Sequence, residues 1–250
     1  MKKIIILNKK EGETPLEALE KFRSRNKEYK NTKMTYAGRL DPMASGVLLV
    51  LASGETKNKE KYLLLDKEYE FEVLFGFTTD TYDILGKVTF SVYPKLEKDF
   101  IKKEIKNNLK NFLGELDQKY PMYSSKTVKG KPLFSYARSG KRINIPEKRI
   151  FIKKLILCRV REISDEKLLG NIKKRILKVE GDFRQEEILK TWEKKLGHAL
   201  AGRKFFIASF KIRCSSGTYV RGIANSLGEK MKIPTLAFSI KRTRVGRYVL

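Results

Sequence analysis

The chain has 250 residues, of which 41% are hydrophobic and 34% charged, so it can bury a core beneath a heavily charged surface. Its 55 Lys and Arg residues against 29 Asp and Glu give a formal net charge of +26, which favours a polyanionic partner. Two cysteines and one histidine exclude zinc fingers and disulfide scaffolds, so we expect no metal and a reducing, cytoplasmic location. The longest purely apolar run, residues 47–52, is far shorter than the roughly 20 residues of a membrane span.

Apolar periodicity predicts a mixture of strands and helices along the chain. Residues 4–7 are expected to form a buried first strand, and a helix over residues 14–25 begins with a capping box and spaces Leu16, Leu19 and Phe22 helically. The further expected elements are a buried strand at 47–52, a helix at 55–65, a half-buried strand at 69–75, a helix at 98–112, strands at 150–163 and 205–214, a helix at 219–230 and a strand around 245–249. Because these elements show no regular βαβ alternation, we predict an α+β fold.

Residues 118–146, called the basic segment below, contain no acid. They contain basic and aromatic residues in alternation: Lys119, Tyr120, Tyr123, Lys126, Lys129, Lys131, Phe134, Tyr136, Arg138, Lys141 and Arg142. Cations bind phosphates and aromatic rings stack on bases, so the segment is typical of one that grips RNA. The alternative is a solvated basic loop whose aromatic side chains merely fix it to the body of the protein.

Asp41 is the only acid in residues 29–54, and Pro42 follows it. Gly38 and Gly46 give the backbone conformational freedom on either side. A carboxylate held there in a basic protein stays ionised and can serve as a nucleophile or base without a metal. The alternative is an ordinary Asp-Pro turn, a common dipeptide.

Residues 38–48, Gly-Arg-Leu-Asp-Pro-Met-Ala-Ser-Gly-Val-Leu, resemble the G-x-L-D-P-x-A-x-G-x-L motif of the TruB family of tRNA pseudouridine synthases, which acts on uridine 55 of the T-arm. Further matches follow in family order at residues 7–12, 54–57, 67–69, 79–81, 121–138 and 214–221. The match therefore extends over most of the chain.

The resemblance implies a role for each matching residue. Asp41 would be the catalytic aspartate that forms a covalent adduct with the target nucleotide, and Arg221 would pair with it through both carboxylate oxygens. Tyr69 would pack against the flipped uracil and take part in the proton step, although the residues alone favour a strand core residue, because Tyr69 begins the period-two run. Tyr219 and Ile240 would line the uridine pocket.

Two further substrate contacts, Tyr36 and Lys57, are expected beside that pocket. Tyr36 lies where the family usually has a histidine, and its ring can still stack on RNA. Lys10 likewise replaces the usual proline of the opening motif. The resemblance implies RNA contacts from Arg39, Lys126, Lys129, Lys131, Arg138 and Arg142.

Residues 164–203, called the insert below, are longer than the family's usual hairpin. A helix starting near Asp182 is expected to place three apolar residues on one face: Ile188, Trp192 and Leu196. The insert mixes acids with its bases, so we interpret it as a docked structural helix, with partner binding as the alternative. His198 is expected to be an exposed C-terminal cap of that helix.

The resemblance predicts one pseudouridine-synthase-like domain over residues 1–250: a long, mostly antiparallel mixed sheet with flanking helices, a central cleft and the basic segment as a thumb, without the family's C-terminal PUA domain. The predicted reaction isomerises uridine to pseudouridine without a cofactor. We expect tRNA as the partner, no membrane, no obligate protein partner and a monomer. The alternatives are a non-catalytic RNA-binding protein or tRNA folding chaperone on the same scaffold, and a ribosome-associated basic protein.

Overall fold

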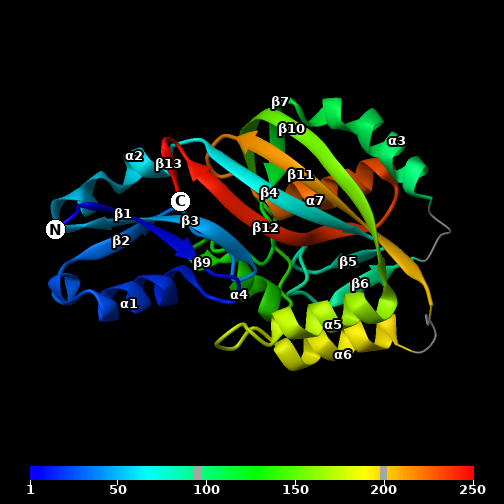
Figure 1. Cartoon of the computed structure of the whole chain (residues 1–250), viewed down its shortest axis with the longest axis horizontal. Helices are drawn as coiled ribbons and strands as arrows, with labels where there is room; N and C mark the ends of the chain where they lie inside the picture. Colours follow the sequence, from blue (N-terminus) through cyan, green and yellow to red (C-terminus); the bar gives the residue numbers. More distant parts are fainter. Residues whose placement is uncertain (93–96, 198–201) are drawn as a thin grey trace.

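A nine-stranded mixed sheet forms the centre of the protein (Figure 1). The computed structural model describes residues 1–92, 97–197 and 202–250. The main path of the sheet runs β1 (Ile4–Lys9), β3 (Ala44–Ala52), β12 (Thr235–Val245), β4 (Lys67–Phe75), β11 (Lys204–Cys214), β10 (Glu147–Ser164) and β7 (Gly114–Lys119), with β2 (Met34–Ala37) beside β3 and β13 (Tyr248–Val249) beside β12. All of these pairs are antiparallel except β12 with β3. The predicted α+β class is confirmed.

Helices and two small hairpins surround this sheet. The helices are α1 (Pro15–Arg25), α2 (Lys59–Leu63), α3 (Lys98–Leu109), α4 (Leu133–Arg138), α5 (Asp165–Ile176), α6 (Gln185–Leu196) and α7 (Val220–Met231). The hairpins pair β5 (Phe77–Thr79) with β6 (Val88–Ser91) and β8 (Thr127–Val128) with β9 (Lys131–Pro132). None of the helices in the described residues has the length and apolar character that crossing a membrane requires.

β4 shows that the two faces of the sheet carry different kinds of side chain. Tyr69, Phe71 and Val73 are buried in the largest core cluster, together with residues of α3 and α7. The alternating residues Glu70 and Glu72 form ion pairs with bases of β11 and β10 instead. The period-two prediction for this strand is therefore confirmed.

The insert covers the end of that second face. Ile188, Trp192 and Leu196 are buried as predicted, and they pack with Leu74 of β4. The Trp192 indole donates a hydrogen bond to the carbonyl of Ile84 at 3.2 Å. α6 begins three residues after the expected start, and α5, which lies beside it in Figure 1, was not predicted.

Several predicted elements differ in detail. The first strand lies at a sheet edge, so Ile5 is buried but Ile6 is 38% exposed. Leu16 is 57% exposed because it faces the cleft described below and not the core. The predicted helix at 55–65 is a 3-10 helix, Ser53–Asn58, followed by α2, and the helix at 98–112 is confirmed with a 3-10 last turn.

The basic segment is more regular than a loop. It contains the β8–β9 hairpin and α4, and Leu133 is fully buried. Most of its aromatic side chains contact the protein: the Tyr120 ring lies 5.6 Å from that of Tyr219, and the Tyr136 hydroxyl donates to the carbonyl of Val128. The prediction for His198 lies outside the described residues.

Candidate active site

The turn that carries Asp41 joins β2 to β3 and is fixed by backbone hydrogen bonds. The Ala44 amide donates to the carbonyl of Asp41 at 2.9 Å, and the Gly12 amide donates to the carbonyl of Pro42 at 2.9 Å. The buried ammonium of Lys9 donates to the carbonyl of Ala44 at 2.6 Å. The position of the carboxylate is therefore set by β1 and the loop after it as well as by the turn itself.

β12 approaches the same turn from the other side. Gly46 has a φ of 102°, and a Cβ there would lie 2.1 Å from the carbonyl oxygen of Arg242, so only glycine fits. The Arg242 side chain is fully buried and donates to the carbonyls of Val47 at 2.7 Å, Gly38 at 3.0 Å and Arg39 at 3.4 Å. One buried guanidinium thus joins both ends of the turn to the last long strand.

Arg221, in the first turn of α7, faces Asp41. Its Nε donates to Asp41 Oδ2 at 2.8 Å, while Nη1 donates to the carbonyl of Thr81 at 2.7 Å and Nη2 to the carbonyl of Tyr123 at 2.9 Å. The expectation that the guanidinium holds both oxygens of the carboxylate is wrong, because its other two nitrogens, Nη1 and Nη2, donate to main-chain carbonyls. The second oxygen of Asp41 is left for other partners.

Burial and nearby charges act in opposite directions on the pKa of Arg221. The side chain is 2% exposed, and this desolvation lowers its pKa, but the charges of Asp41 and Asp83 outweigh burial and raise the pKa overall. Arg221 is therefore a permanent cation beneath Asp41, whose side chain is 39% exposed. The carboxylate is paired on its buried side and accessible on the other.

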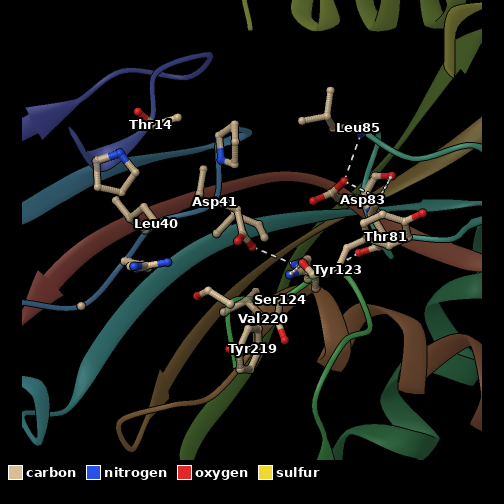
Figure 2. Close-up of a pocket in the computed structure, with 18 of the residues that line it drawn as sticks. Thr14, Leu40, Asp41, Thr81, Asp83, Leu85, Tyr123, Ser124, Tyr219 and Val220 are labelled. Carbon is tan, nitrogen blue, oxygen red and sulfur yellow. Dashed lines mark hydrogen bonds and ion pairs between the residues drawn. The ribbon is translucent and has the colours of Figure 1, made fainter. Parts of the chain in front are cut away.

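The accessible side of Asp41 opens into a cleft of about 680 Å³. Its walls come from the Asp41 turn, the start of α1, β4, the loop after β5, the basic segment, the insert, β12 and the approach to α7. Figure 2 shows Asp41 near the centre of this cleft, with Asp83 on one side and Tyr219 and Val220 on another. The site is assembled from residues far apart in the sequence.

The structure brings some of the predicted site residues to this cleft and leaves others outside it. Asp41 and Arg221 line it together with Tyr36, Arg39, Tyr69, Arg138, Tyr219 and Ile240. The cleft lining does not include Lys57, Lys126, Lys129, Lys131 or Arg142, which are all exposed. The residues that line the cleft can touch a nucleoside bound there, whereas the exposed lysines and Arg142 lie farther away.

Tyr69 forms part of the buried floor. Its desolvation raises the pKa of the phenol to about 12, with the nearby charge of Arg242 acting in the opposite direction. At neutral pH the phenol is therefore protonated, and it forms an apolar wall with a hydrogen-bond donor and not a base.

Tyr219 is held by the start of the basic segment. The Gln118 side chain accepts from the Tyr219 amide at 2.9 Å and donates to the Tyr219 carbonyl at 3.0 Å. Burial raises the pKa of the Tyr219 phenol, and so does the charge of Asp41. The ring is thus a protonated, oriented wall of the cleft.

Asp83 is a site residue that was missing from the sequence-based set. It is 6% exposed and lines the cleft, and its Oδ1 accepts from the Thr81 hydroxyl at 2.7 Å and the Leu85 amide at 3.0 Å. Desolvation raises its pKa to about 6, although the charge of Arg221 lowers it. The feature of the sequence that could have indicated this site is an acid directly before two apolar residues, Ile84 and Leu85.

The replacements noted in the sequence have local consequences. The Lys10 amide donates to Glu13 Oε2 at 2.9 Å, a bond that a proline at this position cannot make. The Tyr36 ring lines the cleft with the Lys59 ammonium 5.8 Å from its centroid. The insert contributes to the cleft as well, through Asp182, Phe183 and Arg184.

The overall fold is that of pseudouridine synthases. A chain in the crystal structure of a Cbf5-Nop10-Gar1 complex matches with a TM-score of 0.57 and 18% identity over 98% of this chain and 49% of that chain. A chain in the structure of an H/ACA RNP bound to a substrate RNA containing 2'-deoxyuridine matches with a TM-score of 0.54 and 17% identity. This protein spans about half the length of these structural neighbours.

The sequence narrows that class to one family. The family model of the TruB family pseudouridylate synthase N-terminal domain matches residues 26–181. The chain is 29% identical to tRNA pseudouridine synthase B of Bacillus anthracis over 100% of its length and 68% of the relative's. It is 31% identical to the protein of that name from Lactobacillus acidophilus, covering 96% of this chain and 67% of the relative. The chain therefore belongs to the TruB family of pseudouridine synthases.

Proposed function

We propose that this protein is a tRNA pseudouridine synthase that isomerises uridine 55 in the T-arm. The observation that carries the proposal is the geometry of Asp41: one face is paired with the buried Arg221 at 2.8 Å, and the other opens into a cleft of about 680 Å³. An ionised carboxylate with a free face beside a pocket can attack an electrophilic carbon. Binding RNA alone requires no carboxylate in that place.

The proposed reaction breaks the N1–C1′ glycosidic bond, turns the uracil, and joins its C5 to C1′. A proton leaves C5 and a proton is gained at N1, so the product has the composition of the substrate. Asp41 supplies the nucleophile, and the hydrogen bond from Arg221 at 2.8 Å orients it. No oxidant, reductant or cofactor is needed for this balance.

Tyr69, Tyr219 and Ile240 would form the walls for the flipped base. A base stacked within the T-arm cannot reach Asp41, and a fitted pocket with aromatic and apolar walls lowers the cost of extrusion. The raised pKa of Tyr69, about 12, opposes deprotonation at neutral pH. Tyr69 would therefore transfer a proton only when the bound substrate lowers that pKa.

The RNA would be held outside this pocket by exposed cations. Arg39 and Arg138 lie at the cleft, and the other predicted contacts are Lys57 and Lys126, Lys129, Lys131 and Arg142 of the basic segment. In this proposal the basic segment is the thumb that contacts the T-arm, and Phe134, 38% exposed at the cleft, is its free aromatic ring. The protein would act as a monomer in the cytoplasm.

The decisive experiment uses a T-arm RNA labelled with tritium at uridine C5, because the reaction releases that label as water. We expect release with the wild type and none with Asp41→Asn, while both proteins bind the RNA within about threefold of each other. Equal release from the two proteins, or none from the wild type, would contradict the enzyme and leave a non-catalytic RNA-binding protein or chaperone.

A further inference from the structure

The insert touches both sides of the Asp41–Arg221 pair through two arginines. Arg175 lies in α5, and Arg184 immediately precedes α6. In Figure 1 the connection between these helices extends beneath α4 of the basic segment, whose Arg138 contacts Asp182. Each arginine is bound to a carboxylate elsewhere in the fold, so its charge is already neutralised.

Arg175 fixes the loop behind Asp41. Its Nε and Nη2 donate to the two carboxylate oxygens of Glu11 at 2.9 and 2.7 Å, and its side chain is 9% exposed. The next residue, Gly12, donates its amide to the carbonyl of Pro42. Gly12 itself lies so close to the insert that an added Cβ would be 2.7 Å from the carbonyl oxygen of Lys178.

Arg184 fixes the segment behind Arg221. Its Nη1 pairs with Asp80 Oδ2 at 2.8 Å, and its Cζ lies 4.2 Å from the centroid of the Tyr123 ring. The carbonyl of Tyr123 in turn accepts the hydrogen bond from Nη2 of Arg221 at 2.9 Å. The Arg184 side chain is 17% exposed, which strengthens a cation–π contact relative to one in water.

A third contact joins the insert to the basic segment. Arg138, at the end of α4, donates to the carbonyl of Asp182 at 2.9 Å, and its guanidinium lies 3.9 Å from the Asp182 carboxylate. The residues at the tip of the insert therefore hold the basic segment at two points, Tyr123 and Arg138. Both points lie on the wall of the cleft.

We propose that the insert is a brace that fixes the two halves of the Asp41–Arg221 pair relative to each other, with Arg184 and Arg175 as its positioning residues. This inference rests on the proposed function for its effect on turnover. The arginines are bound to carboxylates and largely buried, so they act through Tyr123 and Glu11 and not on phosphates. A small misplacement of a nucleophile is costly, because the reaction rate depends steeply on near-attack geometry.

Arg184→Ala tests the brace in the free protein, without RNA. Trypsin cleaves after Lys and Arg except before proline, and the basic segment contains five such sites in residues 126–142, at Lys126, Lys129, Arg138, Lys141 and Arg142. Without Arg184 the segment loses its contact at Tyr123, so we expect cleavage within 126–142 to be at least about fivefold faster, in proportion to the open population. The matched control is Lys194→Ala, which removes one exposed cation and one trypsin site from α6.

The same two variants are then compared in single-turnover tritium release at saturating T-arm RNA. We expect the rate constant for Arg184→Ala to fall about tenfold, with RNA affinity nearly unchanged, and Lys194→Ala to match the wild type. Arg184→Lys keeps the ion pair with Asp80 but not the flat contact with Tyr123, so it should recover only part of the rate.

Unchanged cleavage or unchanged turnover in Arg184→Ala would overturn the brace. If the wild type itself releases no tritium, the proposed function fails, and the digestion still tests whether the insert holds the segment. The contact between Arg175 and Glu11 is tested separately. Glu11→Gln removes the charge that Arg175 binds while keeping the shape of the side chain. A rate equal to that of the wild type in Glu11→Gln would overturn the role given to Arg175.

Discussion

The basic segment and the insert meet at the same cleft, but they do so by different physical means. The basic segment exposes unpaired cations such as Lys129 and Lys131, and its charge is visible in the sequence. The insert reaches the cleft with Arg184, whose charge is paired with Asp80 and whose side chain is mostly buried. The comparison teaches two different things: exposed excess charge marks where we propose that an anionic partner is held, whereas a buried, paired arginine marks where we propose that the site is positioned.

The largest effect is expected where a buried arginine is removed from the pair itself. Arg221→Ala leaves two main-chain carbonyls without donors and Asp41 without its cation, so turnover should fall at least about a thousandfold and stability by about 3–5 kcal/mol. Tritium release and urea unfolding measure the two losses.

The control for this change is Arg213→Ala, which removes a 54% exposed arginine paired with Glu68. An exposed pair contributes less than about 1 kcal/mol, so stability should scarcely change. Retained activity of Arg221→Ala at neutral pH would contradict the role given to the pair.

The packing of the insert is the next test. Trp192 is fully buried, its ring lies 5.2 Å from that of Phe77, and its indole binds a carbonyl. Trp192→Ala should lower the free energy of unfolding by about 3–5 kcal/mol, measured in urea. Leu177→Ala, which truncates a 70% exposed leucine of the insert, should cost less than about 1 kcal/mol. Similar losses in the two variants would show that the insert is not docked as described.

Asp83 gives a prediction about pH. Burial raises its folded pKa to about 6 from the usual 3.8, so the folded state favours the protonated carboxyl. The resulting stabilisation is complete below pH 3.8 and is lost as pH rises through 6, a change of about 3 kcal/mol. Asp83→Asn keeps the shape without the charge, so the difference in unfolding free energy between variant and wild type should grow between pH 4 and 6. A constant difference over this range would contradict the shift.

The smallest effect is expected in the basic segment. Lys129→Ala combined with Lys131→Ala should weaken RNA binding several-fold and lower the slope of log affinity against log salt by about 1.4–1.8, while the single-turnover rate constant stays unchanged. The control, Lys103→Ala with Lys106→Ala, removes the same charge from exposed positions of α3, which lies far from β9 in Figure 1. If both pairs weaken binding equally, the basic segment has no special role in holding the RNA.

The elements that a sequence can predict here are those with a local cause. The capping box at Thr14 starts α1, and the alternation through Tyr69 and Phe71 defines β4. The exposure of Ile6 depends on which strand lies at the sheet edge, and that of Leu16 depends on the cleft, so neither was available from local pattern.

The residues of the candidate site likewise fall into those that the sequence identifies and those that only the fold brings together. Asp41 was identifiable as an isolated acid before a proline, and its pairing with Arg221 required the family resemblance because 180 residues separate them. Asp83 and Arg184 were missed, since their significance depends on burial and on partners brought together by the fold. The hydrogen bonds from Arg221 to the carbonyls of Thr81 and Tyr123 cannot be predicted from residue types, because the acceptors are main-chain atoms.

The central position of β12 has a consequence for how the protein is made. This strand lies between β3 and β4, and its Arg242 holds the carbonyls on both sides of Asp41. Until residues 235–245 have left the ribosome, strands β3 and β4 have no common neighbour. The turn that carries Asp41 is therefore completed only after β12 has been made, and a nascent chain that lacks β12 exposes unpaired strand edges.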